Sequence, residues 1–183
     1  QNNENVLVVT TKQVYNEFST GSQDVGAIRN LVKMFYDRAG GVDQMPKNLL
    51  LFGDASFDYK NKLDNNSNYV PTYQSWTSSS IENSYCTDDY FGVLEDDEGA
   101  WNGSISSWEL IDLGIGRIPA SSAIEAERFV EKVLKYNDLN SSGDWRNKIC
   151  FVADDIDEGW EHMLFEDAER CAEYVDNNFP QFN

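Results

Sequence analysis

Short apolar runs alternate with longer amphipathic stretches in the first fifty residues. The run Leu49, Leu50, Leu51, Phe52 is unbroken and lies between Pro46 and Gly53. A run this short between turn-forming residues is typical of a strand buried on both faces. Residues 5–11 form a second apolar, β-branched run, which predicts another buried strand.

A helix is predicted between these two strands. Asp24 is its expected N-cap, and Gly40 and Gly41 end the pattern. The apolar positions recur at helical spacing: Ile28, Leu31, Val32, Phe35 and Tyr36. Strand, helix and strand in this order form the unit from which parallel sheets with right-handed crossovers are built.

The second half repeats this alternation. Residues 110–118 predict a strand interrupted by two glycines, and residues 148–153 predict another buried strand. A helix capped by Ser121 or Ser122 lies between them, and a last helix follows residue 161. We therefore expect one α/β domain over residues 1–183, with a mostly parallel sheet flanked by helices.

Residues 55–105 break the pattern. They are rich in Asn, Ser, Asp, Tyr and Trp and show little periodicity, apart from a short hairpin expected around residues 90–94 and 101–105. A long irregular segment inside a compact domain is usually functional or mobile.

Acidic residues outnumber basic ones: the chain has 32 Asp and Glu and 14 Lys and Arg, which gives a net charge of -18. This balance argues against nucleic acids and anionic membranes as partners, because phosphate binding needs a basic face. No apolar run reaches the roughly 18 residues of a transmembrane segment. The chain starts on a strand and stops after a helix, so we expect it to be a piece of a longer protein.

Several stretches resemble the gingipain-type cysteine peptidase family. They follow the family order over almost the whole chain: residues 14–19, 27–29, 34–38, 51–60, 70–73, 87–92 and 113–120. Within that family the chain is most similar to the sortase branch of type IX secretion.

The resemblance implies a caspase-like fold in two lobes, of which this chain matches the first. In the family, the catalytic His stands in a His-Gly context and the nucleophilic Cys follows the next strand, both in the second lobe. The implied partners are that second lobe of the same chain and a polypeptide substrate, the secreted cargo. The implied activity is cleavage of C-terminal sorting signals and attachment of the cargo to a surface glycolipid, by a protein that is secreted or held at the outer-membrane cell surface.

A Cys–His pair inside this chain is the competing hypothesis. A thiolate nucleophile needs a neighbouring base. The only histidine, His162, is followed by Met163 and is expected to start a helix. Cys86 lies in the irregular segment, and Cys150 and Cys171 lie in apolar surroundings where Cys acts as a small hydrophobe. We therefore expect no catalytic residue in this chain.

The acidic run around Asp96, Asp97 and Glu98 is a candidate calcium site. Hard cations prefer several oxygen ligands, and Gly99 permits a tight turn. The family resemblance also implies calcium as a cofactor. A solvated hairpin tip is the favoured alternative, because the spacing is not that of an EF-hand.

Carboxylates at the expected strand ends complete the candidates. Asp155 and Asp157 follow a predicted strand, and the resemblance implies an acidic residue lining a substrate pocket in this loop. Asp54 also ends a strand, where α/β proteins bind ligands. Arg117 is expected to pair with an acid such as Asp54 or Asp112 and so to have a structural role.

Two other functions fit the same features. The irregular segment 55–105 fits a binding or scaffold module that recognises a protein partner. A flavodoxin-like ligand domain fits the strand end at Gly53 and Asp54, but the chain has no glycine-rich phosphate loop.

Overall fold

The computed structural model describes residues 5–60, 62–77, 79–80, 83–99 and 110–182. The chain forms two compact units, residues 1–130 and 131–183, and the division falls inside a helix. The expectation of a single domain over residues 1–183 therefore stays a prediction, and each unit is described by itself.

The first unit contains most of the regular structure. Its helices are α1 (Thr11–Phe18), α2 (Val25–Asp37), the 3-10 turns η1 (Val42–Gln44) and η2 (Asp89–Gly92), and the start of α3 (Ala123–Asn137). Its strands are β1 (Asn48–Phe52), β2 (Tyr73–Gln74), β3 (Cys86–Thr87) and β4 (Gly114–Ile118).

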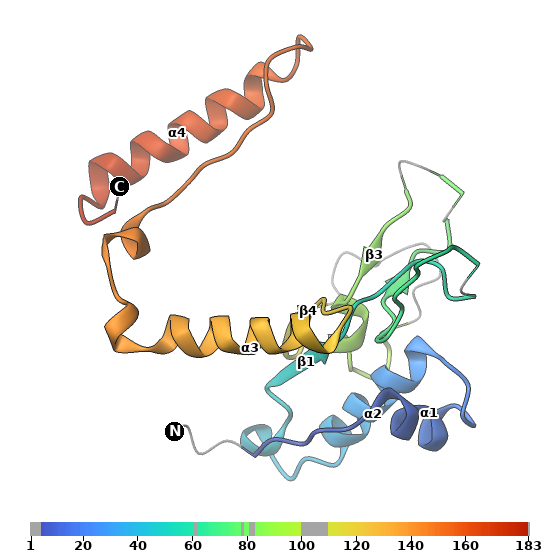
Figure 1. The fold of residues 1–183 in the computed structure, drawn as a ribbon. Helices are drawn as coiled ribbons and strands as arrows, with labels where there is room; N and C mark the ends of the chain where they lie inside the picture. The colour runs from blue at the N-terminus through green and yellow to red at the C-terminus, as the bar shows by residue number, and fades with distance from the viewer. Residues whose placement is uncertain (1–4, 61, 78, 81–82, 100–109, 183) are drawn as a thin grey trace. The chain divides into compact units, whose positions relative to one another are not determined.

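The sheet at the centre of this unit consists of β1 and β4, which pair in parallel with Leu50 opposite Gly116. A separate antiparallel pair joins β2 and β3. Helices α1 and α2 lie side by side on one side of the parallel pair (Figure 1). The molecule thus has a parallel sheet flanked by helices, although that sheet has only two strands within the described residues.

Alternating burial along β1 shows which face of the sheet carries the core. Leu51 is 3% exposed, whereas its neighbour Leu50 is 59% exposed. The inward side chains pack against α1, α2 and η2 in two adjoining clusters. These contain Val14, Ala27, Ile28, Leu51 and Phe91 in one, and Val32, Leu94 and Leu113 in the other. The prediction that this strand is buried on both faces is therefore wrong for this unit, because the face that carries Leu50 remains accessible.

Helix α2 confirms the predicted helix and its N-cap. The backbone N–H of Gly26 donates to the Asp24 carboxylate at 2.8 Å. This bond satisfies one of the amides that a helix leaves free at its start. Both α3 and α4 (His162–Asn178) also form where the pattern predicts helices.

The predicted strand over residues 5–11 is wrong. Residues 5–10 have no regular structure, Val8 is 86% exposed, and Thr11 begins α1. The apolar pattern did not reveal this helix, but Thr10 and Gln13 form a capping box that starts it. An apolar run becomes a strand only when a neighbouring strand binds its backbone, and no described strand pairs with residues 5–10.

The predicted hairpin is also wrong where the structure describes it. Residues 89–92 form the 3-10 turn η2 rather than a strand, because the amide of Phe91 bonds back to the carbonyl of Asp88 at 3.0 Å. The other expected arm, residues 101–105, lies outside the described residues.

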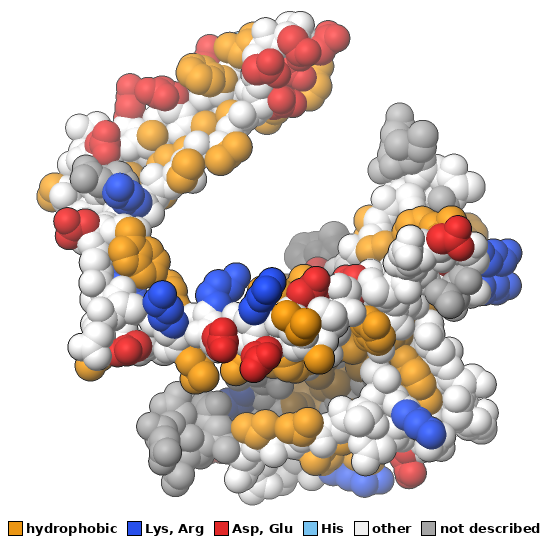
Figure 2. Space-filling model, viewed as in Figure 1, with side chains coloured by type: hydrophobic (Ala, Val, Ile, Leu, Met, Phe, Trp, Pro, Cys, Tyr) orange, Lys and Arg blue, Asp and Glu red, His pale blue; other side chains and the backbone are white. Residues whose placement is uncertain are grey.

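The second unit contains the end of α3, two 3-10 turns, η3 (Leu139–Ser141) and η4 (Asp144–Asn147), and α4. The strand predicted over residues 148–153 is wrong, since this stretch is irregular and Val152 is 87% exposed. Between residues 131 and 182, Glu161 is the one buried residue. Acidic and exposed hydrophobic side chains both gather along α4 (Figure 2).

No helix among the described residues is long and apolar enough to cross a bilayer.

Candidate functional site

The C-terminal end of β1 is built around a tight backbone turn. Gly53 has φ +155, and a Cβ atom there would lie 2.8 Å from Cγ2 of Val70. Only glycine fits a backbone approach this close. The amide of Gly53 donates to Ile118 at 2.9 Å and that of Asp54 to Ala120 at 3.0 Å, so the pairing with the β4 side continues past the strand.

Arg117 joins four parts of this site. Its Nε and Nη2 donate to the two carboxylate oxygens of Asp88, each at 2.7 Å. Its Nη1 donates to the carbonyls of Gly53 at 2.9 Å and Val70 at 2.7 Å, and Nη2 reaches Pro71 at 3.3 Å. The Arg117 and Asp88 side chains are only 14% and 22% exposed. A planar guanidinium with several donors suits such a junction better than an ammonium does.

The acid that pairs with Arg117 is therefore Asp88, not Asp54 or Asp112 as the sequence suggested. Asp54 accepts a hydrogen bond from the hydroxyl of Ser67 instead. Asp112 accepts from the backbone amide of Leu94 at 2.8 Å. Each carboxylate thus holds a loop, Asp54 through Ser67 and Asp112 through Leu94.

We call residues 54–69 the exit loop, with residue 61 outside the description. The carbonyl of Asp54 accepts from the amides of Tyr69 at 3.0 Å and Val70 at 3.1 Å, which closes the base of the loop. Inside it, the carboxylate of Asp58 accepts from the amide of Leu63 at 2.7 Å, and the carbonyl of Asp58 accepts from Asn66 Nδ2 at 2.8 Å. Asp58 is 9% exposed, so the loop has a polar centre.

Tyr59 ties the exit loop to the strand that follows it. Its hydroxyl donates to the carbonyl of Thr72. Burial raises the pKa of Tyr59 to about 12, with smaller effects from neighbouring groups. The phenol therefore stays protonated and available as a donor throughout the physiological range.

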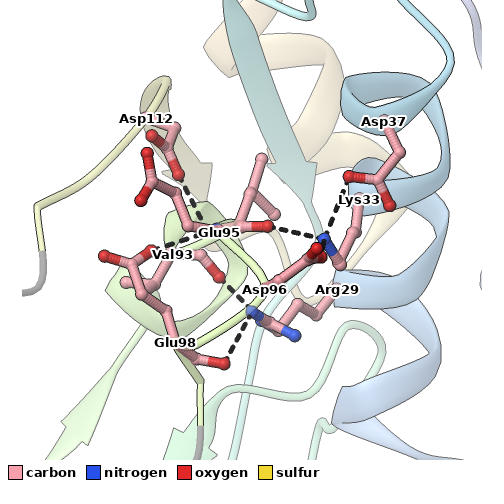
Figure 3. Close-up of polar contacts among 9 residues, drawn as sticks. Arg29, Lys33, Asp37, Val93, Glu95, Asp96, Glu98 and Asp112 are labelled. Carbon is pink, nitrogen blue, oxygen red and sulfur yellow. Dashed lines mark hydrogen bonds and ion pairs between the residues drawn. The ribbon is translucent and has the colours of Figure 1, made fainter.

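The acidic turn, residues 95–98, lies against α2 (Figure 3). Lys33 Nζ donates to Asp37 at 2.9 Å, to Asp96 at 2.8 Å and to the carbonyl of Leu94 at 2.9 Å. Arg29 donates from Nε to the carbonyl of Val93 at 2.8 Å. Arg29 Nη2 also donates to the carbonyl of Glu98 at 3.3 Å, so two cations of α2 hold the turn and the two residues before it.

These contacts bear on the calcium prediction. The hydrogen bond from Lys33 lowers the pKa of Asp96, which keeps this carboxylate ionised and paired. The carboxylate of Glu98 accepts from the amide of Glu95 at 3.1 Å. Within the described residues, Asp96, Asp97 and Glu98 do not form a group that could hold a metal ion. A cation at this turn would therefore need Asp96 to leave Lys33.

The cysteines and the histidine are divided between the two units. Cys86 lies in the first unit, where burial, followed by the charge of Asp88, raises the pKa of its thiol. A raised pKa disfavours the thiolate that nucleophilic catalysis requires. His162 lies in the second unit and begins α4, with its ring nitrogen 2.8 Å from the carbonyl of Gly159. All three cysteines are exposed free thiols, so the apolar surroundings predicted for Cys150 and Cys171 are wrong for this unit.

The loop with Asp155 and Asp157 lies in the second unit, and both residues are exposed. Its shape depends on neighbouring carboxylates. The amides of Asp157 and Glu158 donate to Glu161 Oε2 at 3.1 and 2.7 Å, and the amide of Asp155 donates to Asp154 at 3.1 Å.

The sequence analysis did not single out Asp88, Lys33 or Arg29. One local signal could have found Lys33: Asp37 stands four residues further along the same helix, which is the spacing of a helical ion pair. The contacts across 63 residues to Asp96 and across 29 residues to Asp88 have no local signal.

Comparison with known proteins shows the family of this chain. The model of peptidase family C25 matches residues 1–183. Among solved structures, the chain is similar to the one titled "Crystal structure of dimeric latent PorU from Porphyromonas gingivalis", with a TM-score of 0.60 and 33% sequence identity. The match covers 92% of this chain and 15% of that chain.

Comparison with curated proteins gives no match. The chain spans only a small part of the length of the PorU chain to which it is similar. The family model, in contrast, covers the present chain from end to end. The chain belongs to peptidase family C25, the gingipain family.

Proposed function

We propose that this chain is the first, non-catalytic lobe of a secreted gingipain-type cysteine peptidase. One observation carries the proposal: the family model spans the whole chain, yet the chain matches only 15% of the PorU structure. The raised pKa of Cys86 supports a nucleophile elsewhere. In this proposal the fold is caspase-like and the second lobe supplies both catalytic groups.

The specific role that we propose is a type IX secretion sortase. It would cleave C-terminal sorting signals from secreted polypeptides at the outer-membrane cell surface. The similarity to PorU, at 33% identity, supports this role over that of a general peptidase. Asp155 and Asp157 would then contribute an acidic wall to the substrate pocket, because their carboxylates are exposed and the loop shape depends on Glu161.

Calcium is the cofactor that we propose, at the acidic turn. Asp96 is exposed and three further acidic residues share the turn, so a rearrangement of the turn in which Lys33 gives up Asp96 would supply a cation with oxygen ligands. On binding, calcium would replace the ammonium group of Lys33 as the partner of the Asp96 carboxylate.

The test of the peptidase proposal uses the full-length protein and an unfolded polypeptide substrate. We expect cleavage that iodoacetamide abolishes, and we expect the substrate-protected cysteine, identified by mass spectrometry, to lie outside residues 1–183. The variant Cys86→Ala should cleave normally. Cleavage that is insensitive to alkylation, or lost in Cys86→Ala, would contradict the proposal.

A further inference from the structure

We draw no further inference here: the strongest candidate, the open face of the parallel pair β1–β4 on which Leu50 and Phe52 are exposed and Leu50 lies opposite Gly116, carries nothing because nothing among the described residues shows what covers it.

Discussion

The guanidinium of Arg117 and the carboxylate of Asp88 form two parallel hydrogen bonds of 2.7 Å, between residues 29 positions apart. Arg117 is on β4, and Asp88 directly precedes η2. The same guanidinium bonds the backbone at both ends of the exit loop. One side chain of the sheet thus fixes the connections that surround the end of β1.

Replacing Arg117 by Lys should destabilise the protein although the charge is kept. An ammonium cannot make two parallel bonds to Asp88 and also reach the carbonyls of Gly53 and Val70. Largely buried acceptors would be left without donors, so we expect a loss of about 2 kcal/mol in the free energy of unfolding. Urea denaturation measures it.

The control for this change is Lys33→Met, which removes a pair whose acid, Asp96, is almost fully exposed. Exposed ion pairs contribute little to stability, so this variant should lose less than Arg117→Lys. A double-mutant cycle that combines Arg117→Lys with Asp88→Asn should show a favourable coupling energy between Arg117 and Asp88. If Arg117→Lys is as stable as the wild type, the junction has no structural role.

Replacing Gly53 by Ala should also destabilise the protein. The new Cβ would meet Cγ2 of Val70 at 2.8 Å, and φ at this position is +155. Relief requires the base of the exit loop to move, so we expect a loss of about 2 kcal/mol. The matched control is Gly116→Ala on β4, where a Cβ meets nothing within 4 Å. Equal stabilities of the two variants in thermal denaturation would contradict the close packing.

These residues show how far sequence reasoning reaches. The short apolar run predicts β1, and the cap Asp24 with its periodic residues predicts α2, because both signals are local. The runs at residues 5–11 and 148–153 carry an equally strong local signal, yet neither is a strand here. A strand depends on a neighbour that supplies hydrogen bonds, and the run itself does not identify that neighbour.

The candidate site, like the fold, could be predicted from the sequence only in part. Arg117 after two glycines indicated a structural arginine, but the choice of Asp88 over Asp54 depends on a loop that brings residues 88 and 117 together. The exit loop depends on Ser67, Asn66 and Asn68, which in the sequence are three members of a polar run. Local hydrogen bonds of such side chains fold turns, but their partners are chosen by the surrounding structure.

Alkaline pH should weaken the protein through Tyr59. Burial raises the folded-state pKa to about 12, above its ordinary value of about 10. The stabilisation is therefore fully present below pH 10 and is lost as the pH rises through 12, because the unfolded chain ionises first. Tyr59→Phe should reduce this loss, measured by urea denaturation at pH 9 and 11. The exposed Tyr69→Phe serves as the control, and identical slopes for all three proteins would contradict the assignment.

Calcium should act at the acidic turn through competition with Lys33. If calcium binds there, it raises the melting temperature by mass action. The double variant Asp96→Asn, Asp97→Asn should remove this rise. Lys33→Met should enlarge it, because Asp96 is then free to bind the ion. A calcium response that survives the double variant, or that Lys33→Met abolishes, would place the ion elsewhere.

Asp155 and Asp157 give the last prediction, which concerns substrate preference in the full-length enzyme. Both are exposed, and the bonds that shape their loop end on Asp154 and Glu161. Changing either to Asn removes a negative charge but leaves those bonds, so the melting temperature should stay within about 1 °C of the wild type. If these carboxylates line the pocket, kcat/KM should fall about tenfold for substrates with a basic side chain, equivalent to about 1.4 kcal/mol. The same ratio for neutral substrates should not change.

The control for this prediction is Glu161→Gln, at a residue that is 6% exposed and accepts two amides of the loop. It should lower stability and affect basic and neutral substrates alike, because it changes the shape of the loop and not its outward charge. A pocket role therefore requires a charge-selective effect at Asp155 or Asp157 that Glu161→Gln does not reproduce. If neither Asn variant alters the preference, these two carboxylates belong to the acidic surface alone, and specificity for basic side chains has to come from another part of the enzyme.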